Sequence, residues 1–211
     1  MAYDLEEQEQ LSALKGWWQQ YGKLVIITVV GATLAVGGVR GWHYYKNQQA
    51  SSAAVLFGQL QMAERGNDHK KVRDIATQIV DNYASTQYAT LASLSAAKSD
   101  FETGDLPAAK KRLQSVIDGA REEEVRDVAR LRLARLLLDE KNPAEALKQL
   151  EAKHGESFAG LYAEVRGDAL IASGKSAEAR AAYQTAFDKS DSASPSRQIL
   201  QLKLDALGEA K

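Results

Sequence analysis

Hydrophobic residues follow two different patterns along this chain. Sixteen consecutive uncharged residues, LVIITVVGATLAVGGV, lie between Lys23 and Arg40. From about residue 46 onward, apolar residues instead recur every three or four positions, which is the period of an amphipathic helix. No window alternates strictly between apolar and polar residues, as a half-buried β-strand would. The pattern therefore predicts an all-α protein with one apolar segment near its N-terminus.

The apolar segment has the composition of a single transmembrane helix. Its sixteen residues would cover about 24 Å of a hydrocarbon core that is about 30 Å thick. Flanking aromatic and basic side chains can complete the span, because they are favourable at the headgroup level. We therefore expect a transmembrane helix at residues 23–45, after an N-terminal segment at residues 1–22. The expected membrane-interface anchors are Trp17, Trp18, Tyr21, Lys23, Arg40, Trp42, Tyr44 and Tyr45.

A cleaved signal peptide fits this region less well than an uncleaved anchor. The leader is long and contains four acidic residues, Asp4, Glu6, Glu7 and Glu9, where a signal peptide has a short basic region. The stretch at residues 40–43, RGWH, is also a poor match to the small-residue pattern of a cleavage site.

The charges beside the span do not determine its orientation. Lys15 and Lys23 lie on one side of it, and Arg40 and Lys46 lie on the other. The positive-inside rule depends on an excess of basic residues on one side, so the residues alone leave both topologies open.

The remainder of the chain, residues 46–211, contains recurring helix pairs. Three turns are followed, after four or five positions, by an alanine: Gly104 and Ala109, Lys141 and Ala146, Gly174 and Ala179. A small residue lies seven positions before each turn: Ala97, Ala134 and Gly167. A large residue lies four positions after each alanine: Leu113, Leu150 and Tyr183. This arrangement is typical of the tetratricopeptide repeat, a helix pair of 34 residues.

Two further segments complete the predicted repeat domain. A more degenerate unit has its turn at Gly66-Asn67 and an apolar face formed by Val72, Ile75 and Ile79. The apolar segment near residues 195–207 is expected to form the capping helix that closes the C-terminal end. The predicted fold class is therefore all-α, with one N-terminal transmembrane helix followed by a tetratricopeptide-like α-solenoid.

Composition excludes several classes of function. The chain has no cysteine, which excludes thiol catalysis, cysteine-bound metals and disulfides. Its formal net charge is −1, which gives no electrostatic case for binding nucleic acid. The three histidines, His43, His69 and His154, are scattered and lack metal-ligand spacing. We therefore predict no catalytic, cofactor-binding or metal-binding residues and no enzymatic activity.

One basic cluster is a candidate binding surface. Four arginines lie on the first helix of one repeat: Arg126, Arg130, Arg132 and Arg135. First helices line the inner groove of a tetratricopeptide array, so these residues could bind acidic or C-terminal peptide segments. Alternatively, they could form ion pairs with neighbouring acidic residues and have no partner outside the chain.

Three features together resemble the YfgM family. They are the segment EQLSALKGWWQQYGK, the aromatic exit GWHYY after the apolar span, and the repeat domain. The resemblance implies a single-pass protein of the bacterial inner membrane, with a cytoplasmic N-terminus and a periplasmic C-terminal domain. It also implies association with the SecYEG translocon, the periplasmic chaperone PpiD and exported polypeptides. The family offers no catalytic residues.

The expected function is that of a non-enzymatic adaptor at the protein-export channel, linking the translocon to periplasmic chaperones and newly exported proteins. An alternative is a membrane scaffold that sequesters a cytoplasmic signalling or stress-response regulator through the acidic leader. Neither the binding surface nor the oligomeric state follows from the residues.

Overall fold

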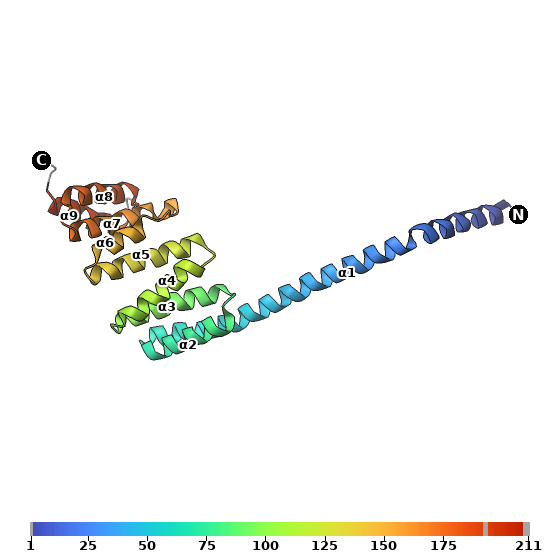
Figure 1. Ribbon diagram of the computed structural model, residues 1–211, viewed down its shortest axis with the longest axis horizontal. Helices are drawn as coiled ribbons and strands as arrows, with labels where there is room; N and C mark the ends of the chain where they lie inside the picture. The colour runs from blue at the N-terminus through green and yellow to red at the C-terminus, as the bar shows by residue number, and fades with distance from the viewer. Residues whose placement is uncertain (1, 192–193, 209–211) are drawn as a thin grey trace. The chain divides into compact units, whose positions relative to one another are not determined.

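The computed structural model describes residues 2–191 and 194–208 and is helical apart from short connections. It contains the α-helices α1 (Ala2–Arg65), α2 (His69–Tyr83), α3 (Gln87–Glu102), α4 (Leu106–Gly119), α5 (Glu123–Asp139), α6 (Pro143–Leu150), α7 (Ala159–Ala172), α8 (Ser176–Lys189) and α9 (Pro195–Ala206), and the short 3₁₀ helix η1 (Glu156–Phe158). The chain divides into two compact units, residues 1–51 and 52–211. Within the second unit, α2 to α9 are stacked in sequence order (Figure 1). The prediction of an all-α fold is confirmed.

The first unit is formed by most of α1, whose apolar surface is not covered by protein. This helix of 64 residues joins the leader, the apolar segment and the first helix of the repeat domain without interruption. Its most apolar 18-residue window is only 6% buried. The hydroxyls of Thr28 and Thr33 donate to the carbonyls of Leu24 and Val29, at 2.9 and 2.8 Å. These bonds satisfy the donor of each hydroxyl within the helix itself.

The second unit is built from helix pairs joined by four equivalent turns. Four turn residues have positive φ angles: 52° at Asn67, 81° at Gly104, 59° at Lys141 and 75° at Gly174. In each turn the next residue's N–H donates to the carbonyl five positions before it, at 2.8 to 2.9 Å. This bond satisfies one of the free carbonyls at the helix end. The four turns therefore define four helix pairs, of which α1 and α2 form the first.

Small residues allow the two helices of a pair to approach each other. Ala109, Ala146 and Ala179 are all completely buried. At Gly167 the contact is closest, because a Cβ atom there would lie 2.4 Å from the ring of Tyr183. The helices of that pair can therefore pack at this separation only if residue 167 has no side chain.

The first helix pair reverses this arrangement of sizes. The position that is small in the other pairs holds Leu60, and the position that is large in the others holds Ala76. Both side chains are fully buried in one hydrophobic cluster with Val72. The exchange keeps the combined volume of the two side chains similar, which preserves close packing while it weakens the sequence pattern.

The C-terminal end of the stack is covered by α9. Leu200 and Leu204 are buried in one cluster with Tyr183 and Ala186 of α8. On the opposite face of α9, Ile199 and Leu202 are 52% and 69% exposed. Residues 192 and 193, which precede this helix in the sequence, lie outside the described part of the chain.

Candidate interaction surfaces

The four arginines of α5 lie on two different faces of that helix. Arg132 lies six positions after Arg126, which corresponds to a rotation of about 240° around the helix axis. Arg126 Nη1 donates to the carbonyls of Ala120 and Arg121, at 2.9 and 3.4 Å. Arg130 Nη1 pairs with Asp127 at 3.3 Å. These two arginines thus form contacts within the protein, at and near the connection between α4 and α5.

Arg132 and Arg135 lie together on the other face and line a cleft of about 400 Å³. Residues of three helices form this surface, which we call the α3–α5 cleft: Ala97, Lys98, Phe101, Leu113, Arg132, Arg135, Leu136 and Asp139. Its volume lies within the range of about 300–1,000 Å³ that small ligand pockets occupy. The structure thus brings together two of the four arginines that the sequence singled out.

Apolar and basic side chains share the α3–α5 cleft. Phe101, on α3, is 43% exposed, whereas most large apolar residues of the second unit are buried or half-buried. Sequence reasoning did not identify Phe101 or Lys98. A signal was present for Phe101, because it lies four positions after the small residue Ala97, one turn along the same face of the helix.

The positive charge in the α3–α5 cleft is only partly compensated. Arg132 Nη1 approaches the carbonyl of Leu94 at 3.4 Å. Lys98 Nζ lies 3.8 Å from a carboxylate oxygen of Glu102. Among the described residues, Arg135 has no ion pair or hydrogen bond from its side chain. Exposed guanidinium groups in this arrangement are available to an anionic partner.

The pKa of Arg132 reflects this environment. Partial burial lowers the pKa of its guanidinium, and the neighbouring charge of Arg135 lowers it further, while Glu64 acts in the opposite direction. Arg132 remains charged at neutral pH, because arginine ordinarily titrates above about pH 12. Two like charges are therefore held side by side, and an anion placed between them would relieve their repulsion.

A fully buried acid, Asp127, fixes the segment that follows α6. Its carboxylate accepts hydrogen bonds from the backbone N–H of Gly155 at 2.9 Å and from the hydroxyl of Tyr162 at 3.2 Å. Burial raises the pKa of Tyr162 to about 12, and the nearby charge of Asp127 contributes to the same shift. The ring of His154 lies 4.1 Å from the ring of Tyr162. Asp127 thus connects α5, the loop before η1 and α7.

A second cleft, of about 510 Å³, lies where α6 is short. Helix α6 has eight residues, whereas its counterparts α4 and α8 each have fourteen. The cleft is bordered by Leu150 at the end of α6, by His154, and by residues of α7 and α8. Its walls carry one exposed base, Arg166, and one exposed acid, Glu178, so the cleft has no net preference for either charge.

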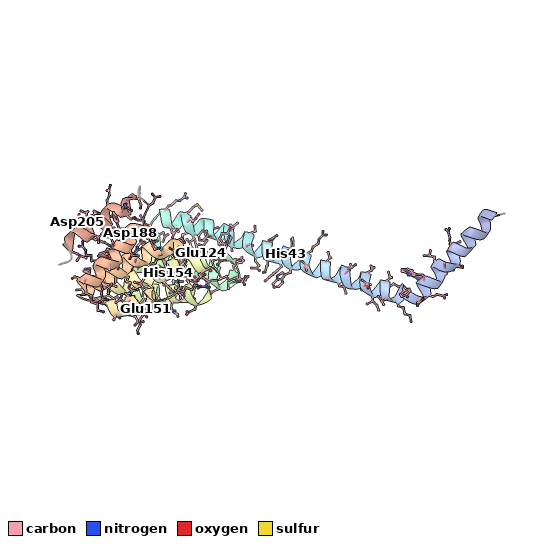
Figure 2. All side chains as sticks on the ribbon, turned by 90° about the horizontal axis from the view of Figure 1, so that it is seen from above. His43, Glu124, Glu151, His154, Asp188 and Asp205 are labelled. Atoms are coloured by element: carbon pink, nitrogen blue, oxygen red, sulfur yellow. The ribbon has the colours of Figure 1, made fainter. Side chains whose placement is uncertain are left out.

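The histidines are not brought together in a metal site. No group of three or more metal-ligating side chains occurs among the described residues. Figure 2 shows His43 projecting from the exposed surface of α1. His69 Nδ1 instead lies 3.3 Å from the hydroxyl of Ser99 and 3.6 Å from Glu102, a local contact between α2 and α3.

The aromatic residues on either side of the apolar segment are exposed and contact one another. Trp17 packs near Trp18 and Tyr21, with ring centroids 6.4 and 5.9 Å apart. Beyond the segment, Trp42 lies 6.3 Å from Tyr45, and Lys46 Nζ lies 5.3 Å from the Trp42 ring. The remaining anchors expected there, Lys23, Arg40 and Tyr44, are also exposed. The membrane role of these residues stays a prediction.

Comparison with known proteins relates the whole chain to one family. A model of the tetratricopeptide repeat-like domain family matches residues 15–209. Proteins named "Ancillary SecYEG translocon subunit" from Aggregatibacter actinomycetemcomitans and Neisseria gonorrhoeae are each 31% identical, over 98% of this chain and 100% of their own length. The Escherichia coli protein of that name is 30% identical over 95% of this chain and 96% of its own. No solved structure matches the chain.

These matches bear on the predictions made from the sequence. The match to the repeat family confirms the tetratricopeptide-like fold. The full-length matches confirm the family resemblance and the expectation of a non-enzymatic protein. The chain therefore belongs to the family of ancillary SecYEG translocon subunits, which carry a tetratricopeptide repeat-like domain.

Proposed function

We propose that this protein is a membrane-anchored adaptor that associates with the SecYEG translocon and links it to the periplasmic chaperone PpiD and to newly exported polypeptides. The observation that carries the proposal is the extent of the match. Relatives named as ancillary SecYEG translocon subunits align with almost the entire chain, including both the apolar segment and the repeat domain.

The exposed apolar surface of α1 supports the membrane anchor. Large apolar side chains such as Ile27 and Leu34 are each 72% exposed, so lipid or another protein must cover them. Tyr21 and Trp42, which belong to the two aromatic clusters, are separated along the helix by about 31 Å. This separation matches a hydrocarbon core of about 30 Å, with the aromatic rings at both interfaces. We place the N-terminus in the cytoplasm and the repeat domain in the periplasm of the bacterial inner membrane.

The mechanism requires only binding and proximity. An anchor in the inner membrane confines the repeat domain to the neighbourhood of the channel, which raises its effective concentration there. Stacked helix pairs present extended surfaces, which repeat proteins commonly use for binding. The adaptor thus holds a chaperone or an emerging chain close to the site where export ends.

Purification from inner membranes in a mild detergent tests this function. The tagged full-length protein is expected to recover SecYEG and PpiD in amounts well above those recovered with an unrelated single-span protein carrying the same tag. Quantitative mass spectrometry measures the enrichment. Recovery of the protein without any translocon component would contradict the proposed association, and recovery of SecYEG without PpiD would contradict only the link to that chaperone.

A further inference from the structure

The α3–α5 cleft combines two kinds of binding surface in one place. Phe101 and Leu136 provide apolar contact area, and Arg132 and Arg135 provide positive charge beside it. The second cleft, near α6, has no comparable charge bias, because Arg166 and Glu178 face the same space. Of these two clefts, charge complementarity therefore favours the α3–α5 cleft for an anionic ligand.

The chemistry of the α3–α5 cleft also restricts the form of that ligand. Phe101 is exposed next to the basic groups, so a purely ionic ligand would leave its ring uncovered. A ligand that covers the ring must carry a large apolar group within a few ångströms of its negative charge. A peptide with an aromatic or aliphatic residue next to Asp or Glu has both groups at this spacing.

We propose that the α3–α5 cleft binds a short acidic segment of an unfolded exported polypeptide, with Arg132 and Arg135 contacting its carboxylates and Phe101 and Leu136 contacting one large apolar side chain. Unfolded chains are the favoured source, because folded proteins bury most of their aromatic and aliphatic side chains. The inference rests on the proposed function only where it names an exported polypeptide as the source of the segment. The preference for an acidic segment with a large apolar side chain follows from the residues of the cleft and does not depend on the proposed function.

Asp139, on α5, also lines the α3–α5 cleft. A carboxylate of the ligand would be repelled there, whereas Lys98, on α3, would attract it.

Fluorescence anisotropy with the full-length protein in detergent tests the chemistry. The probe is a labelled synthetic peptide in which one Phe is flanked by Asp and Glu; control peptides replace the Phe by Ala or the acids by Lys. The double variant Arg132→Gln/Arg135→Gln is expected to weaken binding of the probe by about tenfold, as loss of two partly exposed charge pairs implies. Phe101→Ala is expected to weaken binding of the probe but not of the Ala peptide.

Arg121→Gln provides the matched control, because Arg121 is exposed outside the cleft. This variant should bind the probe within about twofold of the unchanged protein, since an exposed distant charge contributes little. No binding of the probe, equal binding of the probe and the Ala peptide, or equal loss in the control and the double variant would each overturn the proposal. None of these outcomes would affect recovery of SecYEG, so failure here is distinguishable from failure of the proposed function.

A photo-crosslinking amino acid at position 101, introduced into the full-length protein in cells, tests the source of the segment. Exported chains should give adducts of many masses that disappear when export is blocked. A single adduct of constant mass that persists under the block would identify a folded partner and overturn the assignment to exported polypeptides.

Discussion

Replacing Asp127 by Ala is expected to lower the free energy of unfolding of the repeat domain by about 3–5 kcal/mol, as loss of one partner from a buried ion pair typically does. The carboxylate is completely buried and accepts from Gly155 N–H and Tyr162 O–H. Its removal would leave both donors and the guanidinium of Arg130 without their acceptor. Asp127 is therefore expected to contribute strongly to stability, although the sequence analysis did not identify it.

Urea unfolding of the full-length protein in detergent, followed by circular dichroism, measures this loss. Asp118→Ala is the matched control, because Asp118 is exposed and its carboxylate accepts a hydrogen bond from Gln114, four residues away on the same helix. That change should alter the unfolding free energy by less than about 0.5 kcal/mol. Asp127→Asn keeps the size of the side chain but not its charge. Its loss of unfolding free energy should lie between those of Asp118→Ala and Asp127→Ala. A loss below about 1 kcal/mol for Asp127→Ala would show that water or neighbouring groups satisfy the freed donors.

The substitution Gly167→Ala is expected to destabilise the repeat domain by about 1–2 kcal/mol. Overpacking typically costs about 1–3 kcal/mol, and the higher helix propensity of alanine offsets up to about 1 kcal/mol. The overpacking arises because the new Cβ would lie 2.4 Å from the ring of Tyr183. That ring cannot move freely, because its hydroxyl donates to Asp168 at 2.7 Å. The same urea unfolding experiment measures the change.

Two further variants distinguish the cost of overpacking from the effect of alanine on helix propensity. Gly58 lies inside α1, and a Cβ atom added there would meet no neighbouring atom within 4 Å, so Gly58→Ala should raise stability by up to about 1 kcal/mol. Adding Tyr183→Leu to Gly167→Ala recreates the alanine–leucine combination of the preceding repeats. The double change should therefore cost about 1 kcal/mol less than the sum of the two single changes. Additive costs would show that contact between residues 167 and 183 does not limit the packing.

The sequence identified the helix pairs because the residues that define their turns are local. Gly104 and Gly174 adopt positive φ angles, which glycine tolerates well, and the next helix starts two residues after each. The first pair was harder to recognise, because Leu60 and Ala76 exchange the usual sizes of two packing positions. Pattern matching scores each position separately, whereas packing constrains only the combined volume of the two side chains.

The binding surface was only partly predictable from the sequence. Helical geometry alone separates Arg132 and Arg135 from Arg126 and Arg130, since 3.6 residues complete a turn. Helical spacing also places Phe101 on the face of Ala97, but its contribution to the cleft depends on how closely α3 approaches α5, which the sequence does not give. Likewise, two of the partners of Asp127, Gly155 and Tyr162, lie 28 and 35 residues away in sequence, so only the fold brings them to this carboxylate.

Cysteine labelling in cells tests most directly whether the repeat domain works on the export side of the membrane. The chain has no native cysteine, so single cysteines can be introduced at Ser176, exposed at the start of α8, and at Gln10, exposed before the apolar segment. The outer membrane is permeabilised, and a thiol reagent that cannot cross the inner membrane is added. The account predicts labelling at position 176 and protection at position 10 until the cells are lysed. Protection at position 176 with labelling only after lysis would place the repeat domain in the cytoplasm and contradict the account.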